Sequence, residues 1–110
     1  MKKEIKKKAG RGRDKLTSAD IKKYYLITEK ALRIVKGNGK GKSKIAKGRE
    51  IDGHQIILMA ESYLFDSQFF EKNGDLINAF GAIYYAHGWI DCGVRLGIFD
   101  VKDDKLFTVR

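Results

Sequence analysis

The sequence predicts an all-α protein: a small up-down three-helix bundle with a disordered basic N-terminal arm and a short C-terminal tail. Three stretches place apolar residues at the 3.6-residue period of a helix. The segment EKNGD, residues 71–75, supplies a glycine that can end one helix and an aspartate that can cap the next. A chain of 110 residues with 43% apolar content is enough for one core without a second lobe.

The arm comprises residues 1–16. It has almost nothing apolar to bury and its cations repel one another, so we expect it to be disordered. Thr17 or Ser18 can then cap the first helix, with Asp20 in its first turn. We therefore divide the chain into the arm, a bundle over residues 17–98 with a mobile basic loop at 37–48, and a tail over residues 99–110.

Each predicted helix has one apolar face. The residues expected on the inner face of the first helix are Ile21, Tyr24, Tyr25, Thr28, Leu32 and Val35. Those of the second, over residues 49–72, are Ile56, Met59, Ala60, Tyr63, Ser67 and Phe70, widened by Ile57, Leu64 and Phe65. Those of the third, capped by Asp75 and running over 76–96, are Ala79, Phe80, Ile83, Ala86, Ile90 and Val94. The tail contains strand-like residues without an evident partner strand, so we expect it to pack along the bundle.

Charge is distributed unevenly along the chain. The net charge is +9, and residues 1–50 hold 18 Lys and Arg against five acids, whereas residues 51–110 hold five against nine. Such a split predicts a polyanionic partner. Membrane binding is not expected, because Ile5 is the only large apolar residue of the arm before Leu16. A single cysteine, Cys92, and no apolar leader within residues 1–15 favour the cytoplasm.

We therefore expect a non-enzymatic RNA-associated protein, bound to the ribosome, with no cofactor, no metal and no catalytic residue. Lysine and arginine on glycine-containing segments can follow an irregular phosphate backbone. The residues expected to contact phosphate are Lys2, Lys3, Lys6, Lys7, Lys8, Arg11 and Arg13 in the arm and Lys40, Lys42, Lys44 and Lys47 in the loop. The competing interpretation is that these cations only keep the protein soluble.

The third helix contains three glycines, each costing about 1 kcal/mol relative to alanine. We expect Gly81, Gly88 and Gly93 to allow close approach of a neighbouring helix. Alternatively, this glycine-lined face receives a protein partner or a second copy, which would make the protein an interaction or oligomerisation module.

A polar stripe runs along the same helix. His87, Asp91 and Arg95 follow one another at four-residue spacing, and Asp91 before Arg95 is the favourable order for an ion pair. We expect His87 to act as a structural hydrogen-bonding side chain and Asp66 to reach Arg95 or His87 as a buried partner. An enzyme using His87 and Asp91 would need a pocket that three short helices hardly form.

Residues 61–99 resemble an archaeal helical domain-of-unknown-function family, the one numbered three hundred and fifty-seven. The residues that carry the resemblance are Asp75, His87, Gly88, Asp91, Gly93, Arg95 and Gly97. The resemblance implies a compact three-helix bundle in an archaeal cytoplasm, and no established activity. It also implies that the arm and the basic loop lie beyond the family's usual outline.

Overall fold

The fold is a bundle of three helices, as the sequence predicts. The computed structural model describes residues 13–37, 43–102 and 106–107. Helix α2 spans Ser18–Val35, α3 spans Glu50–Lys72 and α4 spans Leu76–Arg95. The predicted helix boundaries are confirmed to within a residue or two. We expected the arm to be disordered, and residues 1–12 of it lie outside the described residues.

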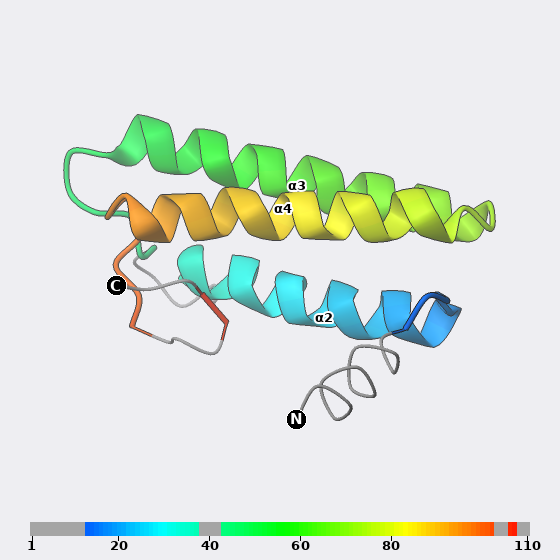
Figure 1. The fold of residues 1–110 in the computed structure, drawn as a ribbon. Helices are drawn as coiled ribbons and strands as arrows, with labels where there is room; N and C mark the ends of the chain where they lie inside the picture. The colour runs from blue at the N-terminus through cyan, green and yellow to red at the C-terminus, as the bar shows by residue number, and fades with distance from the viewer. Residues whose placement is uncertain (1–12, 38–42, 103–105, 108–110) are drawn as a thin grey trace, which may run out of the picture.

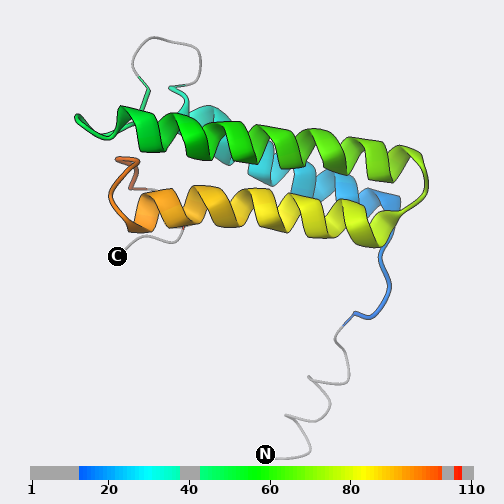
Figure 2. The same cartoon turned by 90° about the horizontal axis from the view of Figure 1, so that it is seen from above.

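Helices α3 and α4 form an antiparallel hairpin, and α2 runs in the direction of α4 and crosses the pair obliquely (Figures 1 and 2). The predicted turn between α3 and α4 is confirmed. Gly74 has φ of 77°, a left-handed conformation that glycine adopts without strain. Asp75 then caps α4, because its Oδ1 accepts the backbone N–H of Asn78 at 3.1 Å.

The start of α2 is a capping box. The N–H of Asp20 donates to Thr17 Oγ1 at 3.2 Å, and the N–H of Thr17 donates to Asp20 Oδ2 at 2.9 Å. Arg13 also pairs with the Asp20 carboxylate. The hydrogen bond from Arg13, followed by the one from the Thr17 backbone, lowers the pKa of Asp20 to about 2. The expected cap at Thr17 is confirmed.

The core lies between the three helices and is closed by residues that follow α4. Its buried apolar members are Ile21, Ala31, Leu32, Val35, Ile56, Ile57, Ala60, Leu64, Ala79, Ile83, Ala86, Ile90, Val94, Ile98, Phe99 and Phe107. Two buried hydroxyls, Thr28 and Ser67, accompany them. The prediction that Phe65 widens the inner face is wrong, since Phe65 is 72% exposed. Each residue turns the helix by about 100°, which carries Phe65 past Leu64 and out of the core.

The basic loop and the start of the tail pair with each other. Ile45 and Phe99 form an isolated antiparallel bridge, in which Ala46 N–H donates to Ile98 O at 2.8 Å and Asp100 N–H donates to Lys44 O at 2.7 Å. Residues 44 and 46 of the predicted loop therefore form hydrogen bonds with the residues after α4, on both sides of the predicted boundary at residue 98. Residues 38–42 lie outside the described residues. Leu106 and Phe107 pack on the core, as expected for the tail.

The side chains of the two bridge residues pack against two helix glycines. A Cβ on Gly53 of α3 would lie 2.8 Å from Ile45 Cδ1, and a Cβ on Gly93 of α4 would lie 2.5 Å from Phe99 Cε2. Close approach at Gly93 is confirmed, although the neighbour is the tail as well as Ile56 of α3. For Gly81 and Gly88 the expectation is wrong: a Cβ there would meet nothing within 4 Å, because both face away from the bundle.

Candidate nucleic-acid interface

A hollow of about 880 Å³ lies at one end of the bundle, between the chain before α3 and the chain after α4. In Figure 1 the end of α2, the start of α3 and the end of α4 meet at this end. Four cations line the hollow, namely Lys44, Lys47, Arg95 and Lys102. Asp100 is the single acid among the lining residues, so the lining carries an excess of three positive charges. We call this site the end hollow.

The backbone around the end hollow is held in place, while its cationic side chains are exposed. Lys44 N–H donates to Val35 O at 3.0 Å, and Lys44 O accepts from Asp100 N–H, so this residue is fixed between α2 and the tail. Arg95 is the last residue of α4. Lys102 lies 3.8 Å from Asp100, an exposed contact that binds weakly and leaves the ammonium available. The site therefore combines fixed positions with mobile charges.

These side chains suit phosphate oxygens. Arg95 offers a planar fork of donors that can meet two oxygens at once, and each lysine supplies a compact charge on a long stem. The expected phosphate-binding residues Lys44 and Lys47 lie here, together with Arg95, which we expected only in a structural or interaction role. Lys102 was not expected. Its position beside Lys44 depends on the bridge between residues 45 and 99.

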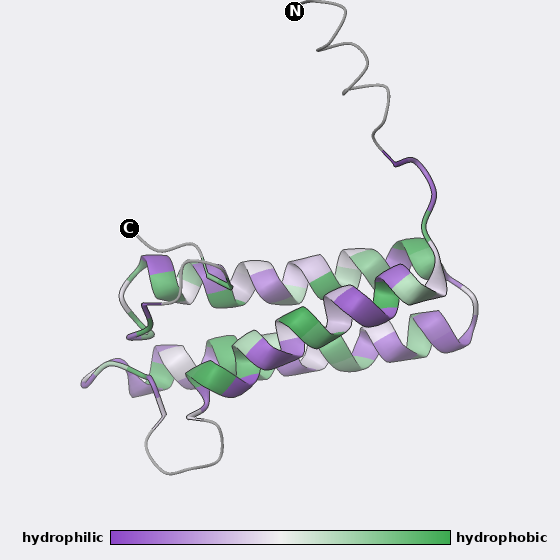
Figure 3. Ribbon diagram, turned by 90° about the horizontal axis from the view of Figure 1, so that it is seen from below, coloured by the Kyte–Doolittle hydropathy of each residue, from purple (hydrophilic) through white to green (hydrophobic). Residues whose placement is uncertain are grey.

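The outer side of α2 is a second basic surface that sequence reasoning missed. Four exposed cations lie on it, namely Lys22, Lys23, Lys30 and Arg33. They occupy the side opposite the buried Ile21, Thr28 and Leu32. The polar side of α2 could therefore have been predicted from the sequence as the side opposite the apolar face. Figure 3 looks onto the bundle from the side of α2 and shows hydrophilic segments along it. Because α2 ends at the end hollow, the two basic surfaces adjoin.

The remaining expected phosphate contacts fall in two groups. Arg13 is described and exposed, and it pairs with Asp20 at the start of α2, far along the helix from the end hollow. The others lie outside the described residues: Lys2, Lys3, Lys6, Lys7, Lys8, Arg11, Lys40 and Lys42.

His87 joins three parts of the fold. Its Nε2 lies 2.7 Å from the carbonyl oxygen of Leu106, so Nε2 carries a proton and donates it. Its Nδ1 lies 2.8 Å from the buried Thr28 Oγ1, and Asp91 Oδ1 lies 3.9 Å from Nε2. The histidine therefore links α2, α4 and the tail, which confirms its expected role as a hydrogen-bonding side chain.

The expected role of Asp66 is wrong, whereas that of Asp75 as a helix cap is confirmed. Asp66 is exposed rather than buried. In the antiparallel hairpin it lies opposite the first half of α4, and about 13 residues at 1.5 Å each separate that level from Arg95. The helical register therefore keeps Asp66 away from the polar stripe.

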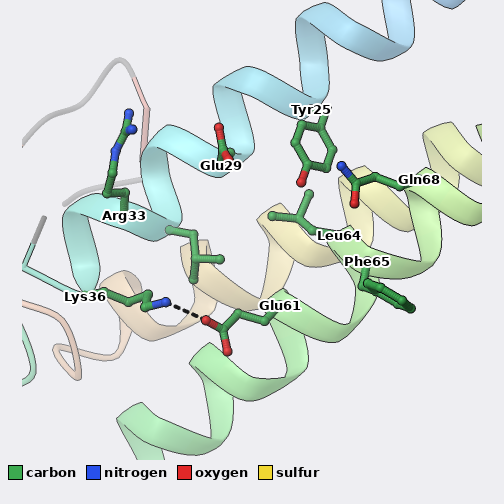
Figure 4. A pocket seen from close by; sticks show the side chains of 9 residues that line it. Tyr25, Glu29, Arg33, Lys36, Glu61, Leu64, Phe65 and Gln68 are labelled. Atoms are coloured by element: carbon green, nitrogen blue, oxygen red, sulfur yellow. Dashed lines mark hydrogen bonds and ion pairs between the residues drawn. The ribbon is translucent and has the colours of Figure 1, made fainter. Parts of the chain in front are cut away.

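A second hollow, of about 590 Å³, runs between α2 and α3 (Figure 4). Leu32 and Leu64 contribute apolar surface, and an ion pair between Lys36 Nζ and Glu61 Oε2 at 2.5 Å crosses it. Burial, and then the charge of Glu29, raise the pKa of Tyr25 on its rim. The cations and acids of this rim balance in number, so it lacks the positive excess of the end hollow.

Within residues 13–37, 43–102 and 106–107, no three His, Cys, Asp or Glu side chains gather closely enough to hold a metal ion. Among the helices that the structure describes, none is long and apolar enough to cross a bilayer.

The model of a family described as Protein of unknown function (DUF357) matches residues 23–99, more than two thirds of the chain. The chain belongs to the DUF357 family. The match is wider than the resemblance over residues 61–99: it spans the basic loop and does not include the arm, residues 1–16. Comparison of this DUF357 protein with curated proteins and with solved structures gave no match.

Proposed function

We propose that this DUF357 protein is a non-enzymatic RNA-associated protein that binds the ribosome through phosphate contacts. The supporting observation is the end hollow, where Lys44, Lys47, Arg95 and Lys102 converge around one acid. The basic side of α2 adjoins it and extends the cationic surface along the bundle. A role on RNA places the protein in the cytoplasm, in keeping with its one cysteine, Cys92, which is free.

Counterion release is the driving force for phosphate binding that we propose at this surface. Each lysine or arginine that neutralises a phosphate releases condensed cations, so affinity falls steeply with salt. With roughly six to eight contacts, affinity for RNA should fall by about 10³ to 10⁵ between about 50 and 200 mM salt. The backbone hydrogen bonds of residues 44, 46 and 100 hold the cationic side chains at one end of a rigid bundle.

The experiment is a salt titration of the full chain with a labelled ribosomal RNA fragment, followed by fluorescence anisotropy. The variant Lys44→Gln/Lys47→Gln/Lys102→Gln should weaken binding and reduce the slope of log affinity against log salt by about 0.7 to 0.9 per lost contact. Lys72→Gln removes one charge at the opposite end of α3 and is the control for charge loss outside this surface, so it should leave the slope unchanged. An affinity that does not change with salt, or that the triple variant leaves unchanged, would refute the proposal. Either result would favour the interpretation that the lysines only keep the protein soluble.

A second candidate, a protein-interaction module, has one observation in its favour. Gly81 and Gly88 face outward between the half-exposed Tyr84 and Tyr85, although glycine costs about 1 kcal/mol inside a helix. The rings on either side are braced, since Tyr84 packs on Phe80 and Tyr85 on Tyr63, both with centroids 4.5 Å apart. A helix of a partner protein could approach α4 closely at these two glycines.

The exposed thiol of Cys92, four residues beyond Gly88 on α4, reports on this face. If a protein partner covers the face, a maleimide should label Cys92 more slowly in a high-salt cell extract than in the purified chain. Gly88→Leu should remove that protection by blocking the approach. Equal labelling rates in extract and buffer would count against this candidate.

A further inference from the structure

The outer side of α3 carries four exposed large apolar side chains in a row interrupted by polar residues. Ile51, Leu58, Phe65 and Phe69 are 79%, 55%, 72% and 61% exposed. The residues at positions 51, 55, 58, 62, 65, 69 and 72 alternate in steps of four and three along the helix, and Gln55, Ser62 and Lys72 complete this series. We call the series the α3 seam. Its member Phe65 also lies at the edge of the hollow between α2 and α3 (Figure 4).

The α3 seam lies on the side opposite the core. The residues of α3 that the bundle buries are Gly53, Ile56, Ile57, Ala60, Leu64 and Ser67. The helix is therefore apolar on two opposite sides, a pattern typical of helices that are buried on both. Alternating four- and three-residue spacing is also the pattern by which two helices pack knobs into holes. Among the residues that the structure describes, the bundle buries one side of α3 and leaves the other exposed.

We propose that the α3 seam pairs with the α3 seam of a second copy of this chain, with the two helices antiparallel about a twofold axis. This inference is independent of the proposed RNA role, because none of the cations of the end hollow or of the basic side of α2 belongs to the seam.

Charge favours the antiparallel arrangement of two identical helices. The first turn of α3 carries Glu50 and Asp52, of which Asp52 pairs with Arg49, and its last turn carries Lys72 next to Glu71. Antiparallel packing brings Lys72 of each copy to the first turn of the other, which makes the contact self-complementary. A parallel pair would instead place like charges together at both ends.

Within the chain, Glu61 of α3 pairs with Lys36 at 2.5 Å and Asp52 pairs with Arg49 at 3.3 Å. The α3 seam itself contains one charged residue, Lys72, whereas four exposed cations lie on the outer side of α2. The approach of a second copy along α3 therefore meets less charge than approach along α2.

Shape supports the same pairing. A hollow of about 400 Å³, lined by Phe65, Gln68, Phe69 and Lys72, lies at the end of the seam. Ile51 projects from the other end with most of its surface exposed. A twofold axis near the middle of α3 brings Ile51 of the second copy to this hollow, and the same contact occurs twice because the interface is isologous.

The available area fits a modest dimer. If each of the four apolar side chains has about 200 Å² of surface, their exposed fractions amount to roughly 500 Å² per copy and roughly 1,000 Å² for the pair. This lies below the roughly 1,200–2,000 Å² of stable specific interfaces, so we expect a weak and reversible dimer.

The first test measures the molar mass of the full chain by sedimentation equilibrium over a wide range of concentration. We expect a reversible dimer that Leu58→Glu/Phe65→Glu weakens at least about 100-fold. The control is Leu26→Glu, which adds one glutamate, against two in the seam variant, at a half-exposed leucine of α2 and should leave the dimer intact. Circular dichroism should show both variants folded, because the replaced side chains are largely outside the core.

A monomer at every concentration would overturn the proposal. So would a dimer that the seam variant leaves intact, or one that Leu26→Glu disrupts equally. A dimer that Gly88→Leu alone abolishes would overturn it as well, by moving the contact to α4.

The second test uses charge reversal to determine the direction of the helices. Lys72→Glu and Glu50→Lys should each dimerise several-fold more weakly than the natural chain, because each places like charges together in its own antiparallel pair. Mixed in equal amounts, the two variants should form a heterodimer in which both end contacts are restored. Single variants that dimerise as tightly as the natural chain, or a mixture with no gain in affinity, would overturn the antiparallel pairing.

Discussion

Gly93 and Gly88 lie five residues apart on α4, and replacing each with alanine should change stability in opposite directions. In both positions alanine gains about 1 kcal/mol of helix propensity. At Gly88 the new Cβ meets nothing within 4 Å, so the gain should remain. At Gly93 the new Cβ would lie 2.5 Å and 2.6 Å from two ring carbons of Phe99 and 3.1 Å from Ile56 Cδ1.

The cost at Gly93 follows from the burial of its neighbour. Phe99 is only 2% exposed, so its ring cannot move aside into solvent. Inserting a methyl group into such a site costs about 1–3 kcal/mol. After subtracting the propensity gain of about 1 kcal/mol, Gly93→Ala should destabilise the protein by about 1 kcal/mol. The difference between the two variants should be about 2 kcal/mol, and propensity cancels from it.

Urea denaturation followed by far-ultraviolet circular dichroism measures this difference. For a chain of this size, about 1 kcal/mol corresponds to a shift of roughly 4–8 °C in Tm, so thermal melts provide an independent check. Because Phe99 pairs with Ile45, we also expect Gly93→Ala to weaken RNA binding at the end hollow while Gly88→Ala does not. Equal free energies of unfolding for the two variants would refute the packing argument.

Two further predictions concern polar contacts. His87→Ala should cost about 2 kcal/mol in urea unfolding, since the buried Thr28 hydroxyl and the Leu106 carbonyl lose their partner, and an unchanged midpoint would contradict this role. Asp20 has a folded pKa of about 2, below its ordinary value of 3.8, so the stability it contributes should be complete above about pH 4 and should disappear as pH falls toward 2. Comparing the urea midpoints of the natural chain and Asp20→Asn between about pH 5 and 2 checks this, and identical pH profiles would show that the contact with Arg13 does not stabilise the fold.

The candidate interface was only partly predictable. Lys44 and Lys47 stand out because they belong to a lysine and glycine run, a signal that lies within a few residues. The cations of α2 were missed although their signal was present, because they are dispersed along a helix that also carries the predicted apolar face. Arg95 and Lys102 give no such signal: they join Lys44 only because residue 45 pairs with residue 99.

The sequence by itself determined the three helices, their ends and most of the core. Helical period, the Thr17 and Asp75 caps and the turn at Gly74 all act over about four residues, so the local sequence contains them. Only the tertiary structure decided that Gly93 is packed and Gly88 is open, and that Phe65 faces outward. These outcomes depend on which neighbour reaches each helix face, and that neighbour can be 37 positions away, as Ile56 is from Gly93.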